Sequence, residues 1–556
     1  MAEARLRQFK NKGRDDSSMR RRRQEQSVEL RKTKRLEALS KRRHVDLVED
    51  GEIANGATDM GTDCAQQNAI ATVPHDMPAF HVLPKDKQQG INEALTCLQA
   101  RVDISPTMVK IRRLVSTSDT IDPIIQSGLL QEVVSVAVES SERQVLEEFS
   151  WILTNVTSGT SEQTEEVVNL GCVPVLVTFL THESLTLQHQ SLWALGNIAG
   201  NSAVHRDLIA SSGVIPYIIQ RLQGCDIHTK NNPQERKIAF LAPWVLSNLC
   251  RFNNPSPSRQ LAEVLVPILV LILGNPSGLF SQTELRDCCW GLSYLTDGYP
   301  GEDGVDPLKE MICSDFQLVP VVVGMIQKSS VNNVSILVPC VRFLGNICSG
   351  TNAQTMVAIN AGILSVAPAL LVVGVDRLII KETIWLLSNC ISSSMALVKV
   401  IAEAGLMTTI INLMTTASYV VQKECSWAIR NFAMVGSPDM VPYFVDAGGI
   451  QAIRHMVTYE DSQIVLNGLE ALTSVLRGGG EHLDKISMMV EEAHILDQLE
   501  LLQCSNNNAV ADEAFSITDE FFASEEVPSL KSLNPVETDN QFRFAAPAQM
   551  PALEHL

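Results

Sequence analysis

The sequence predicts an all-α protein, a solenoid built from stacked helical repeats. The main observation is a tryptophan followed four residues later by an asparagine, as in Trp193 and Asn197, which a helix places on one face. Variants of this pair return at intervals of 42, 51, 46, 52, 43 and 42 residues, the spacing of a repeat array. A composition of 45% hydrophobic but only 5% aromatic residues also suits stacked aliphatic helices. The other copies are Trp151/Asn155, Trp244/Asn248, Trp290/Tyr294, Arg342/Asn346, Trp385/Asn389 and Trp427/Asn431.

Residues 1–50 form a basic arm. They hold 16 Lys or Arg and 9 Asp or Glu, a net charge of +7, so the rest of the chain carries −26 of the total of −19. A segment this poor in apolar residues orders only on a partner, and the acidic body is the nearest oppositely charged surface. A solvated tail is the alternative. The basic residues of its clusters are Arg20, Arg21, Arg22, Arg23, Arg31, Lys32, Lys34, Arg35, Lys41, Arg42 and Arg43.

Four further segments follow the arm. Residues 51–81 are acidic, contain Gly and Asn and lack a helical period, so we expect a flexible linker. The repeat array is expected over residues 82–503. Residues 504–527 are expected to form a terminal acidic helix region, and residues 528–556 a disordered tail.

Within the repeats, a glycine precedes an apolar run, as Gly171 precedes CVPVLVTFL. Glycine adopts the left-handed conformation that lets one helix end and the next begin. A polar turn and the tryptophan-bearing helix then follow. Three helices per unit, with the third carrying the polar face, is the armadillo plan. The corresponding glycines elsewhere are Gly128, Gly213, Gly362, Gly405 and Gly448.

Several classes of protein are disfavoured. The 13 cysteines include no C-x-x-C motif, so we expect reduced thiols rather than zinc or disulfides. The polar, arginine-rich start is no secretory signal, and the longest apolar run, Val264 to Leu273, is too short to span a bilayer. No phosphate loop, nucleophile elbow or paired-histidine motif is present, so we expect a soluble non-enzyme without metal or cofactor.

The sequence resembles the importin alpha family of nuclear-import adaptors. The similarity covers nearly the whole chain. It includes RRRR-x4-VELRK and KRRHV near the start, WILTNVTSGTSEQT (Trp151 to Thr164), WALGNIAGN, WVLSNLCR, CCWGLSYLTDG, WLLSN, and the terminal DEAFSITDEFFASEE. This resemblance implies a right-handed superhelical solenoid of about ten armadillo repeats.

The resemblance also implies the partners. Met19 to Arg43 would bind importin beta, while Lys41, Arg42 and Arg43 could instead lie in the adaptor's own groove and compete with cargo. Cargo proteins would carry basic nuclear localisation signals, and the acidic end would contact the export receptor that recycles the adaptor with the Ran GTPase. The protein would shuttle between cytoplasm and nucleus.

The repeated side chains suit such a peptide. Asn offers a donor and an acceptor to an extended backbone, and Trp rings stack on the aliphatic stems of Lys and Arg. By resemblance, the larger peptide site would comprise Trp151, Asn155, Gly159, Thr164, Trp193, Asn197, Asn201, Trp244 and Asn248. The smaller site would comprise Arg342, Asn346, Asn352, Glu382, Trp385, Asn389, Glu424, Trp427 and Asn431.

Three positions depart from the family pattern. Asn201 and Asn352 stand where the family usually has Asp, and His189 where an acidic residue is common. An Asn keeps an acceptor but loses the charge, and hydrogen bonds to charged groups are the stronger ones. We therefore expect weaker binding of ordinary basic signals or an altered cargo preference. Compensation by Glu162, Asp207 or Asp287 is the alternative.

Two other functions compete with the import adaptor. A catenin-like armadillo scaffold for adhesion or signalling would share the fold, but its groove is expected to be basic, whereas this body is acidic. Nucleic-acid binding through the arginine run would show a steep salt dependence and would be lost when Arg20 to Arg23 are neutralised. We expect neither direct nucleic-acid binding nor membrane insertion.

Overall fold

The computed structural model describes residues 83–223, 232–275, 278–297, 306–315 and 317–522, together with two short strands at 536–538 and 541–543. The chain divides into two compact units, one ending at Leu295 and the other starting at Thr296. We call them the N-terminal and the C-terminal unit. The predicted basic arm and linker lie outside the described residues, as does most of the predicted tail.

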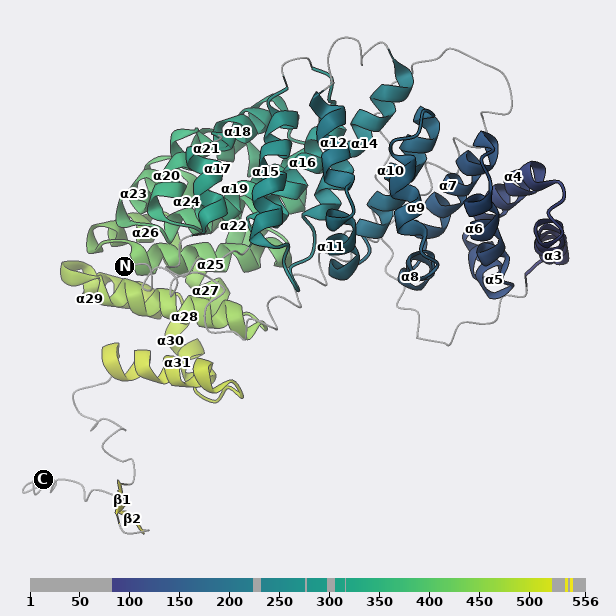
Figure 1. Ribbon diagram of the computed structural model, residues 1–556. Coiled ribbons are helices and arrows are strands. Elements are labelled where there is room, and N and C mark those ends of the chain that lie inside the picture. Colours follow the sequence, from purple (N-terminus) through teal and green to yellow (C-terminus); the bar gives the residue numbers. More distant parts are fainter. Residues whose placement is uncertain are drawn as a thin grey trace, which may run out of the picture. The chain divides into compact units, whose positions relative to one another are not determined.

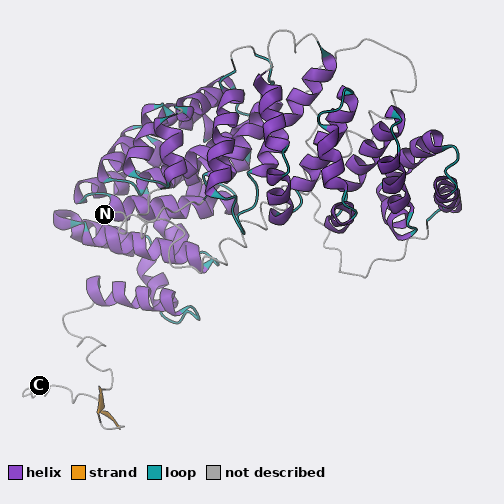
Figure 2. Ribbon diagram, viewed as in Figure 1, coloured by secondary structure: helices purple, strands orange, loops and turns teal. Residues whose placement is uncertain are grey.

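The N-terminal unit consists of helices joined by short loops (Figures 1 and 2). Its elements are α3 (Lys85–Gln99), α4 (Ile104–Val115), η1 (Ser118–Thr120), α5 (Ile121–Gln126), α6 (Leu129–Glu139), α7 (Arg143–Thr157), α8 (Ser161–Asn169), α9 (Cys172–Phe179), α10 (Leu185–Ala199), α11 (Ala203–Ser211), α12 (Val214–Gln223), α14 (Pro233–Leu249), α15 (Arg259–Leu273) and α16 (Gln282–Leu295).

The C-terminal unit is built in the same way up to Phe521. Its elements are α17 (Pro307–Ser314), α18 (Leu318–Lys328), α19 (Val334–Cys348), α20 (Asn352–Asn360), α21 (Ile363–Leu370), α22 (Arg377–Ile391), α23 (Met395–Glu403), α24 (Leu406–Thr416), α25 (Tyr419–Val435), η2 (Pro438–Met440), α26 (Val441–Asp446), α27 (Gly449–Val457), α28 (Ser462–Arg477), η3 (Gly480–His482), α29 (Leu483–Glu492), α30 (Ile495–Leu502) and α31 (Asn508–Phe521).

The turn between the first and second helix of a repeat follows the glycine prediction. All six predicted glycines have positive φ, from 70° at Gly405 to 99° at Gly213. At the equivalent point before α18 and α30, Gln317 (φ 47°) and His494 (φ 56°) take the same left-handed conformation. The predicted three-helix unit is therefore present, and its turn does not depend on glycine at every repeat.

Neighbouring repeats are joined mainly through their third helices. In the N-terminal unit α7 packs on α10, α10 on α14, and α14 on α16; in the C-terminal unit the series is α19, α22, α25 and α28. Their inward side chains are aliphatic and fully buried, as at Leu195, Leu246 and Leu386. This continuous core fixes the third helices side by side, so residues at one position of the repeat form a row.

The end of the C-terminal unit continues the array. Helix α31 packs on α28 and α30, and Val510, Ala514 and Ile517 are buried there. Within the range predicted as a disordered tail, Val536–Thr538 and Gln541–Arg543 pair as a short antiparallel hairpin, β1 and β2. Apart from this hairpin, the described residues are helices, turns and loops, as the all-α prediction required.

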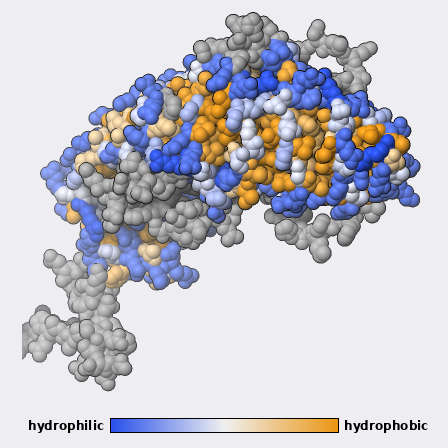
Figure 3. Space-filling model, viewed as in Figure 1, coloured by the Kyte–Doolittle hydropathy of each residue, from blue (hydrophilic) through white to orange (hydrophobic). Residues whose placement is uncertain are grey.

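Part of the helical surface is apolar. Figure 3 shows hydrophobic surface over the region of α12 and α15, where Val264 and Leu271 are each 46% exposed. In the described part of the chain no single helix combines the length and hydropathy needed to cross a membrane, although four sharply bent helix pairs meet that criterion together.

Candidate functional site

The predicted asparagines tie neighbouring third helices together. Asn197 Nδ2 donates to the carbonyl oxygen of Thr154 at 3.1 Å, and Asn248 Nδ2 donates to that of Gly196 at 2.9 Å. In each case the acceptor is the residue just before the asparagine of the previous repeat. The C-terminal unit repeats this bond in Asn389 to Gly345 (3.0 Å) and Asn431 to Ser388 (3.1 Å), while Asn346 donates to Thr296 Oγ1 (3.3 Å). The carboxamide row is thus held by the scaffold before any ligand binds.

Trp244 and Trp385 each pack closely against a glycine of the preceding repeat. A Cβ at Gly196 would lie 2.4 Å from Trp244 Cζ3, and one at Gly345 would lie 2.2 Å from Trp385 Cζ3. Any larger residue would displace the indole, since real Cβ contacts are never that short. These two glycines were not predicted, although each stands directly before an asparagine of the repeated pair.

We call the predicted larger-site residues, which lie in the N-terminal unit, the N-terminal row, and the predicted smaller-site residues of the C-terminal unit the C-terminal row. The first tryptophan of the N-terminal row, Trp151, is in contact with a cationic side chain of the protein itself. The Arg112 guanidinium lies 4.2 Å from the ring centre of Trp151 and pairs with Glu148 at 2.7 Å. Burial raises the pKa of Glu148, outweighing the attraction of Arg112. Arg112 was not recognised from the sequence, because it lies on α4, before the first copy of the repeated pair.

The C-terminal row has two such cations. Arg342 interrupts the tryptophan series as predicted, and its guanidinium lies 5.5 Å from the ring centre of Trp385 while pairing with buried Glu382 at 2.6 Å. Lys381 also lies 3.4 Å from Glu382. Arg430 lies 5.6 Å from the ring centre of Trp427 and pairs with Glu470 on α28. The indole faces of both rows therefore suit cationic side chains.

Two carboxamides of the N-terminal row keep a buried polar atom without a hydrogen-bond partner among the described residues. These atoms are Asn155 Nδ2, a donor, and Asn201 Oδ1, an acceptor. A buried unsatisfied amide group costs about 1–3 kcal/mol, so a site that retains two of them favours a ligand that supplies both an acceptor and a donor. A polypeptide backbone is such a ligand.

Gly159 and Thr164 support the local fold. A Cβ at Gly159 would lie 1.8 Å from Gln163 Oε1, the atom that accepts from Thr160 N and closes the capping box of α8. Thr164 is fully buried, and its hydroxyl bonds the carbonyls of Thr157 and Thr160. Both residues hold α8 against the end of α7.

The remaining predicted residues lie near the contacts between neighbouring repeats. The His189 ring meets the Trp193 ring edge-to-face at 5.5 Å. Asn352, at the start of α20, is exposed, and its Oδ1 accepts from Ser393 Oγ at 3.4 Å. Glu424 is half-buried on α25, one turn before Ala428 and three residues before Trp427. The predicted basic arm residues, Arg20 to Arg43, lie outside the described residues.

The acids considered as substitutes for a carboxylate at Asn201 have other partners. Asp207 pairs with Arg206 at 2.8 Å, and Asp287 pairs with Arg286 at 2.8 Å. Glu162 is exposed on the first turn of α8, where backbone and Thr160 hydrogen bonds lower its pKa. Two of the three candidate carboxylates are thus already engaged by arginines.

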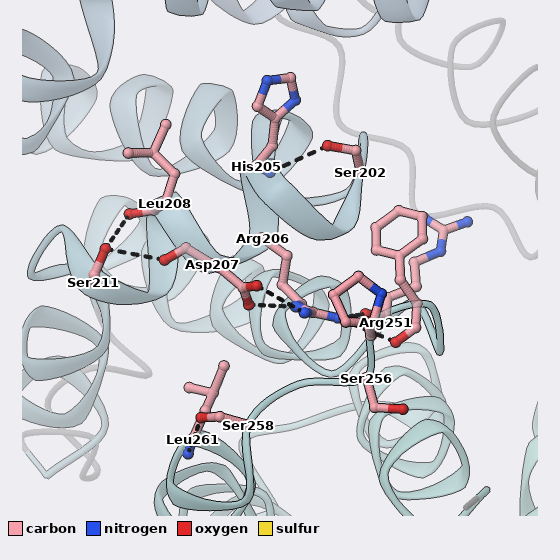
Figure 4. Close-up of polar contacts among 12 residues, drawn as sticks. Ser202, His205, Arg206, Asp207, Leu208, Ser211, Arg251, Ser256, Ser258 and Leu261 are labelled. Atoms are coloured by element: carbon pink, nitrogen blue, oxygen red, sulfur yellow. Dashed lines mark hydrogen bonds and ion pairs between the residues drawn. The ribbon is translucent and has the colours of Figure 1, made fainter.

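Arg206 itself is a fully buried clamp. Its Nη1 donates to the carbonyls of Arg251 (2.9 Å), Phe252 (3.1 Å) and Pro255 (3.0 Å), in the loop that follows α14 (Figure 4). Helix α14 carries Trp244 and Asn248. Arg206 therefore fixes the end of the helix that supplies two residues of the N-terminal row, a role the sequence did not reveal.

Metal and thiol chemistry find little support in the described residues. They contain no cluster of three or more His, Cys, Asp or Glu side chains placed to hold a metal ion. Burial raises the pKa of the Cys172 thiol to about 12 and also raises that of Cys250, so both stay protonated and unreactive.

Comparison with known proteins relates this chain to a known domain, a known repeat and a known fold. Residues 5–81 match the family model of the importin beta binding domain, and residues 160–200 match that of the armadillo/beta-catenin-like repeat. An engineered protein of known crystal structure superposes with a TM-score of 0.64 at 23% identity, covering 78% of this chain and 97% of its own, which supports the fold.

Full-length relatives extend the match. Importin subunit alpha-1a of Oryza sativa subsp. japonica is 31% identical over 522 residues, covering 92% of this chain and 91% of the relative. Importin subunit alpha-4 of Arabidopsis thaliana is 30% identical over 539 residues, covering 94% and 92%. An importin beta binding domain ahead of armadillo repeats supports an adaptor role in nuclear import, in a family of non-enzymatic proteins. The chain belongs to the importin alpha family.

Proposed function

We propose that this protein carries proteins with Lys/Arg-rich nuclear localisation signals, gripping the signal as an extended peptide along the two rows of tryptophan and asparagine. The observation that carries the proposal is the pair of unsatisfied buried atoms, Asn155 Nδ2 and Asn201 Oδ1, among indoles of the N-terminal row. A peptide backbone would satisfy both atoms without requiring one sequence.

Side-chain selection would come from the indoles. The resident Arg112, Arg342 and Arg430 lie 4.2 to 5.6 Å from the tryptophan ring centres, a spacing at which cations are attracted to aromatic faces. Each added Lys or Arg stem of a signal would contribute about 0.5–2 kcal/mol. Several such contacts add up to roughly micromolar binding or tighter.

The N-terminal row would show an altered preference. None of its nine predicted residues is a carboxylate, and Asp207 and Asp287 are paired with arginines. An Asn201→Asp variant should therefore bind a basic peptide about tenfold more tightly, because the carboxylate adds about 1.4 kcal/mol of charge–charge attraction to the bond that a lysine ammonium already makes with an amide oxygen. Calorimetric titration of both proteins with one peptide measures this; equal affinities would remove the proposed change in preference.

The basic arm would link cargo to importin beta. The match of residues 5–81 to the importin beta binding domain supports this, and the second cluster, Lys41 to Arg43, would compete with cargo for the protein's own rows. Removing the residues before about His75 should abolish importin beta capture and strengthen binding of a bipartite basic peptide. If neither changes, the arm serves neither purpose.

Recycling would use the end of the C-terminal unit, through an export receptor acting with the Ran GTPase, so that the protein shuttles between cytoplasm and nucleus. Two acids of α31 are already used within the unit, since Glu513 accepts from Thr473 Oγ1 at 2.8 Å and Glu520 pairs with Arg477 at 2.6 Å. A receptor surface could draw on exposed Asp512 of the same helix.

A further inference from the structure

Three serines in the sequence are followed directly by proline: Ser105, Ser256 and Ser437. Proline has no backbone N–H and restricts the residue before it to an extended backbone, so a binding groove can select it in an extended peptide. A serine before proline can therefore be recognised by an enzyme that transfers a phosphoryl group to hydroxyls. The three serines differ in exposure and in the residues that follow them.

Ser105 and Ser437 are poor phosphate acceptors. Ser105 lies in the first turn of α4, and its hydroxyl oxygen is buried. Ser437 is 8% exposed. The third residue after Ser105 is Met108, which is fully buried, and the third residue after Ser437 is Met440. An enzyme would have to unfold part of a helix to reach Ser105, and neither site offers a charge at the third position.

Ser256 lies in the loop between α14 and α15. Ser256, Pro257 and Ser258 belong to no helix or turn, and the backbone at Ser258 is extended (φ −62°, ψ 152°). Ser256 is half-buried, and its hydroxyl donates to the carbonyl of Asn253 at 3.4 Å, which is long for such a bond. Figure 4 shows this hydroxyl pointing away from Arg206. The Ser256 oxygen is thus weakly held in a segment that already favours an extended backbone.

A base stands three residues after Ser256. Arg259 is the first residue of α15, and its side chain is 64% exposed and pairs with Glu263 at 2.8 Å. Exposed pairs of this kind contribute little, so the guanidinium can leave Glu263 for the carboxylate of a partner. Kinases select their substrates partly by such charges. The sequence Ser-Pro-Ser-Arg therefore combines an acceptor hydroxyl, a proline and a base in one loop.

The loop is attached on both sides of Ser256. Upstream, the Arg206 clamp holds the carbonyl of Pro255 at 3.0 Å, directly before Ser256. Downstream, Ser258 caps the first turn of α15, and Pro257 is buried between the two attachments. A kinase would need to lift Pro257 and release the Ser258 cap. Such an opening is local, because the clamp keeps the end of α14 in place.

We propose that Ser256 is a phosphorylation site for an ATP-dependent protein kinase that recognises proline directly after the serine and a base three residues after it. Ser256 Oγ attacks the γ-phosphorus of ATP, the bond from that phosphorus to the bridging oxygen breaks and releases ADP, and the hydroxyl proton passes to the catalytic carboxylate of the kinase. The phosphoserine brings about −1.5 to −2 charges to the loop that follows Trp244 and Asn248 on α14. This inference does not depend on the proposed peptide binding.

The first test incubates the full chain with a cyclin-dependent kinase and radiolabelled ATP and locates the modified residue by mass spectrometry. We expect label at Ser256 and its loss in Ser256→Ala. Absence of label from the natural protein would overturn the proposal. Label at Ser105 or Ser437 in place of Ser256, or equal labelling of Ser256→Ala, would overturn it as well.

The role of the base is tested with Arg259→Ala. Phosphorylation of Ser256 should become about tenfold slower, because the kinase loses an ion pair while the serine and proline remain. Arg143→Ala is the matched control, since Arg143 also starts a helix, α7, is 61% exposed and pairs with Glu147 at 2.8 Å. It should leave the rate unchanged. Equal rates in Arg259→Ala and the natural protein, or equal slowing by both substitutions, would overturn recognition of the base.

Ser258→Ala tests the local opening and the choice of acceptor together. Loss of the helix cap should make the loop easier to lift, so Ser256 should be phosphorylated about fivefold faster. Because Ser258 is the other hydroxyl of the motif, label that disappears in Ser258→Ala and persists in Ser256→Ala would overturn the assignment to Ser256.

Discussion

The two rows share a scaffold but differ in charge. Both are built from third helices, both bond asparagines to the preceding repeat, and both press a tryptophan onto a glycine. The predicted N-terminal set contains no carboxylate, whereas the C-terminal set contains Glu382 and Glu424. Glu382 also pairs with Arg342 of the preceding repeat, so in the C-terminal row one carboxylate belongs both to the charge of the row and to the contact between repeats.

The rows also differ in the polar contacts that hold their helices in place. In the N-terminal unit, fully buried Arg206 holds the loop after α14 through three carbonyls. In the C-terminal unit the corresponding helix, α23, carries Lys399, whose pairing with Asp439 at 3.8 Å is exposed to solvent. Buried Lys309 of α17 makes a smaller contact of this kind in the C-terminal unit, since its Nζ donates to Ser349 Oγ after α19 at 3.2 Å.

The largest effect should come from breaking the Arg206 clamp. Arg206→Ala leaves three carbonyls without their donor and should lower the free energy of unfolding by about 3 kcal/mol or more, because each buried polar group left unsatisfied costs about 1–3 kcal/mol. Urea unfolding followed by circular dichroism measures it. Lys399→Ala is the matched control and should cost less than about 1 kcal/mol, since exposed pairs contribute little. Equal losses would contradict the contrast between the units.

Substitution of Gly196 and Gly345 tests a feature that both rows share, the close packing of a tryptophan against a glycine. Gly196→Ala and Gly345→Ala should each cost about 1–3 kcal/mol through overpacking and should weaken peptide binding in their own unit, because the displaced Trp244 or Trp385 no longer lines its seam. Gly324→Ala, in α18, has nothing within 4 Å of the new Cβ and should be neutral or slightly stabilising. Tolerance of alanine at both indole sites would show that the tryptophans are not held as described.

Acid should act in opposite directions through two carboxyls, Asp461 of the C-terminal unit and Glu148 of the N-terminal unit. Burial alone would raise the pKa of Asp461, but hydrogen bonds from Lys423, Tyr419 and the Gln463 backbone outweigh it and bring the pKa to about 2. This carboxylate therefore stabilises the fold above the ordinary Asp value, and that contribution is lost as pH falls from about 4 to 2. Asp461→Asn should remove about 1–2 kcal/mol at pH 7 and flatten this loss.

Glu148 of the N-terminal unit gives the comparison for acid. Its pKa is raised by burial, so its ionisation costs folding free energy as pH rises past the ordinary Glu value. Glu148→Gln should not flatten the acid limb of an unfolding curve measured from pH 5 to 2. A Glu148→Gln profile identical to that of Asp461→Asn would contradict the assignment of opposite signs.

Much of the fold could be predicted from the sequence. The tryptophan and asparagine spacing identified the third helices, and the glycine before each apolar run identified the left-handed turn, because both follow from local geometry. The family assignment followed from the same motifs. The hairpin at Val536–Thr538 and Gln541–Arg543 was missed, since this polar segment has no strong alternation of apolar residues.

The site was predicted only in part. Residues within a repeat were found, but contacts between repeats were not, because Arg112 over Trp151, and Glu165 beside His205, join positions 39 and 40 residues apart with no local pattern. The partners of Asp207 and Asp287 were missed for a different reason. Each pairs with the arginine directly before it in the sequence, and only the side-chain directions show that the charge is used.

Photo-cross-linking tests the central claim most directly. A bipartite basic peptide with a photoreactive residue in each cluster is bound to the full chain, irradiated, and its attachment sites are mapped by mass spectrometry. We predict cross-links to α10 and α14 near Trp193 and Trp244, and to α22 and α25 near Trp385 and Trp427. Cross-links confined to other surfaces, such as the exposed apolar face of α15, would contradict peptide binding by the two rows.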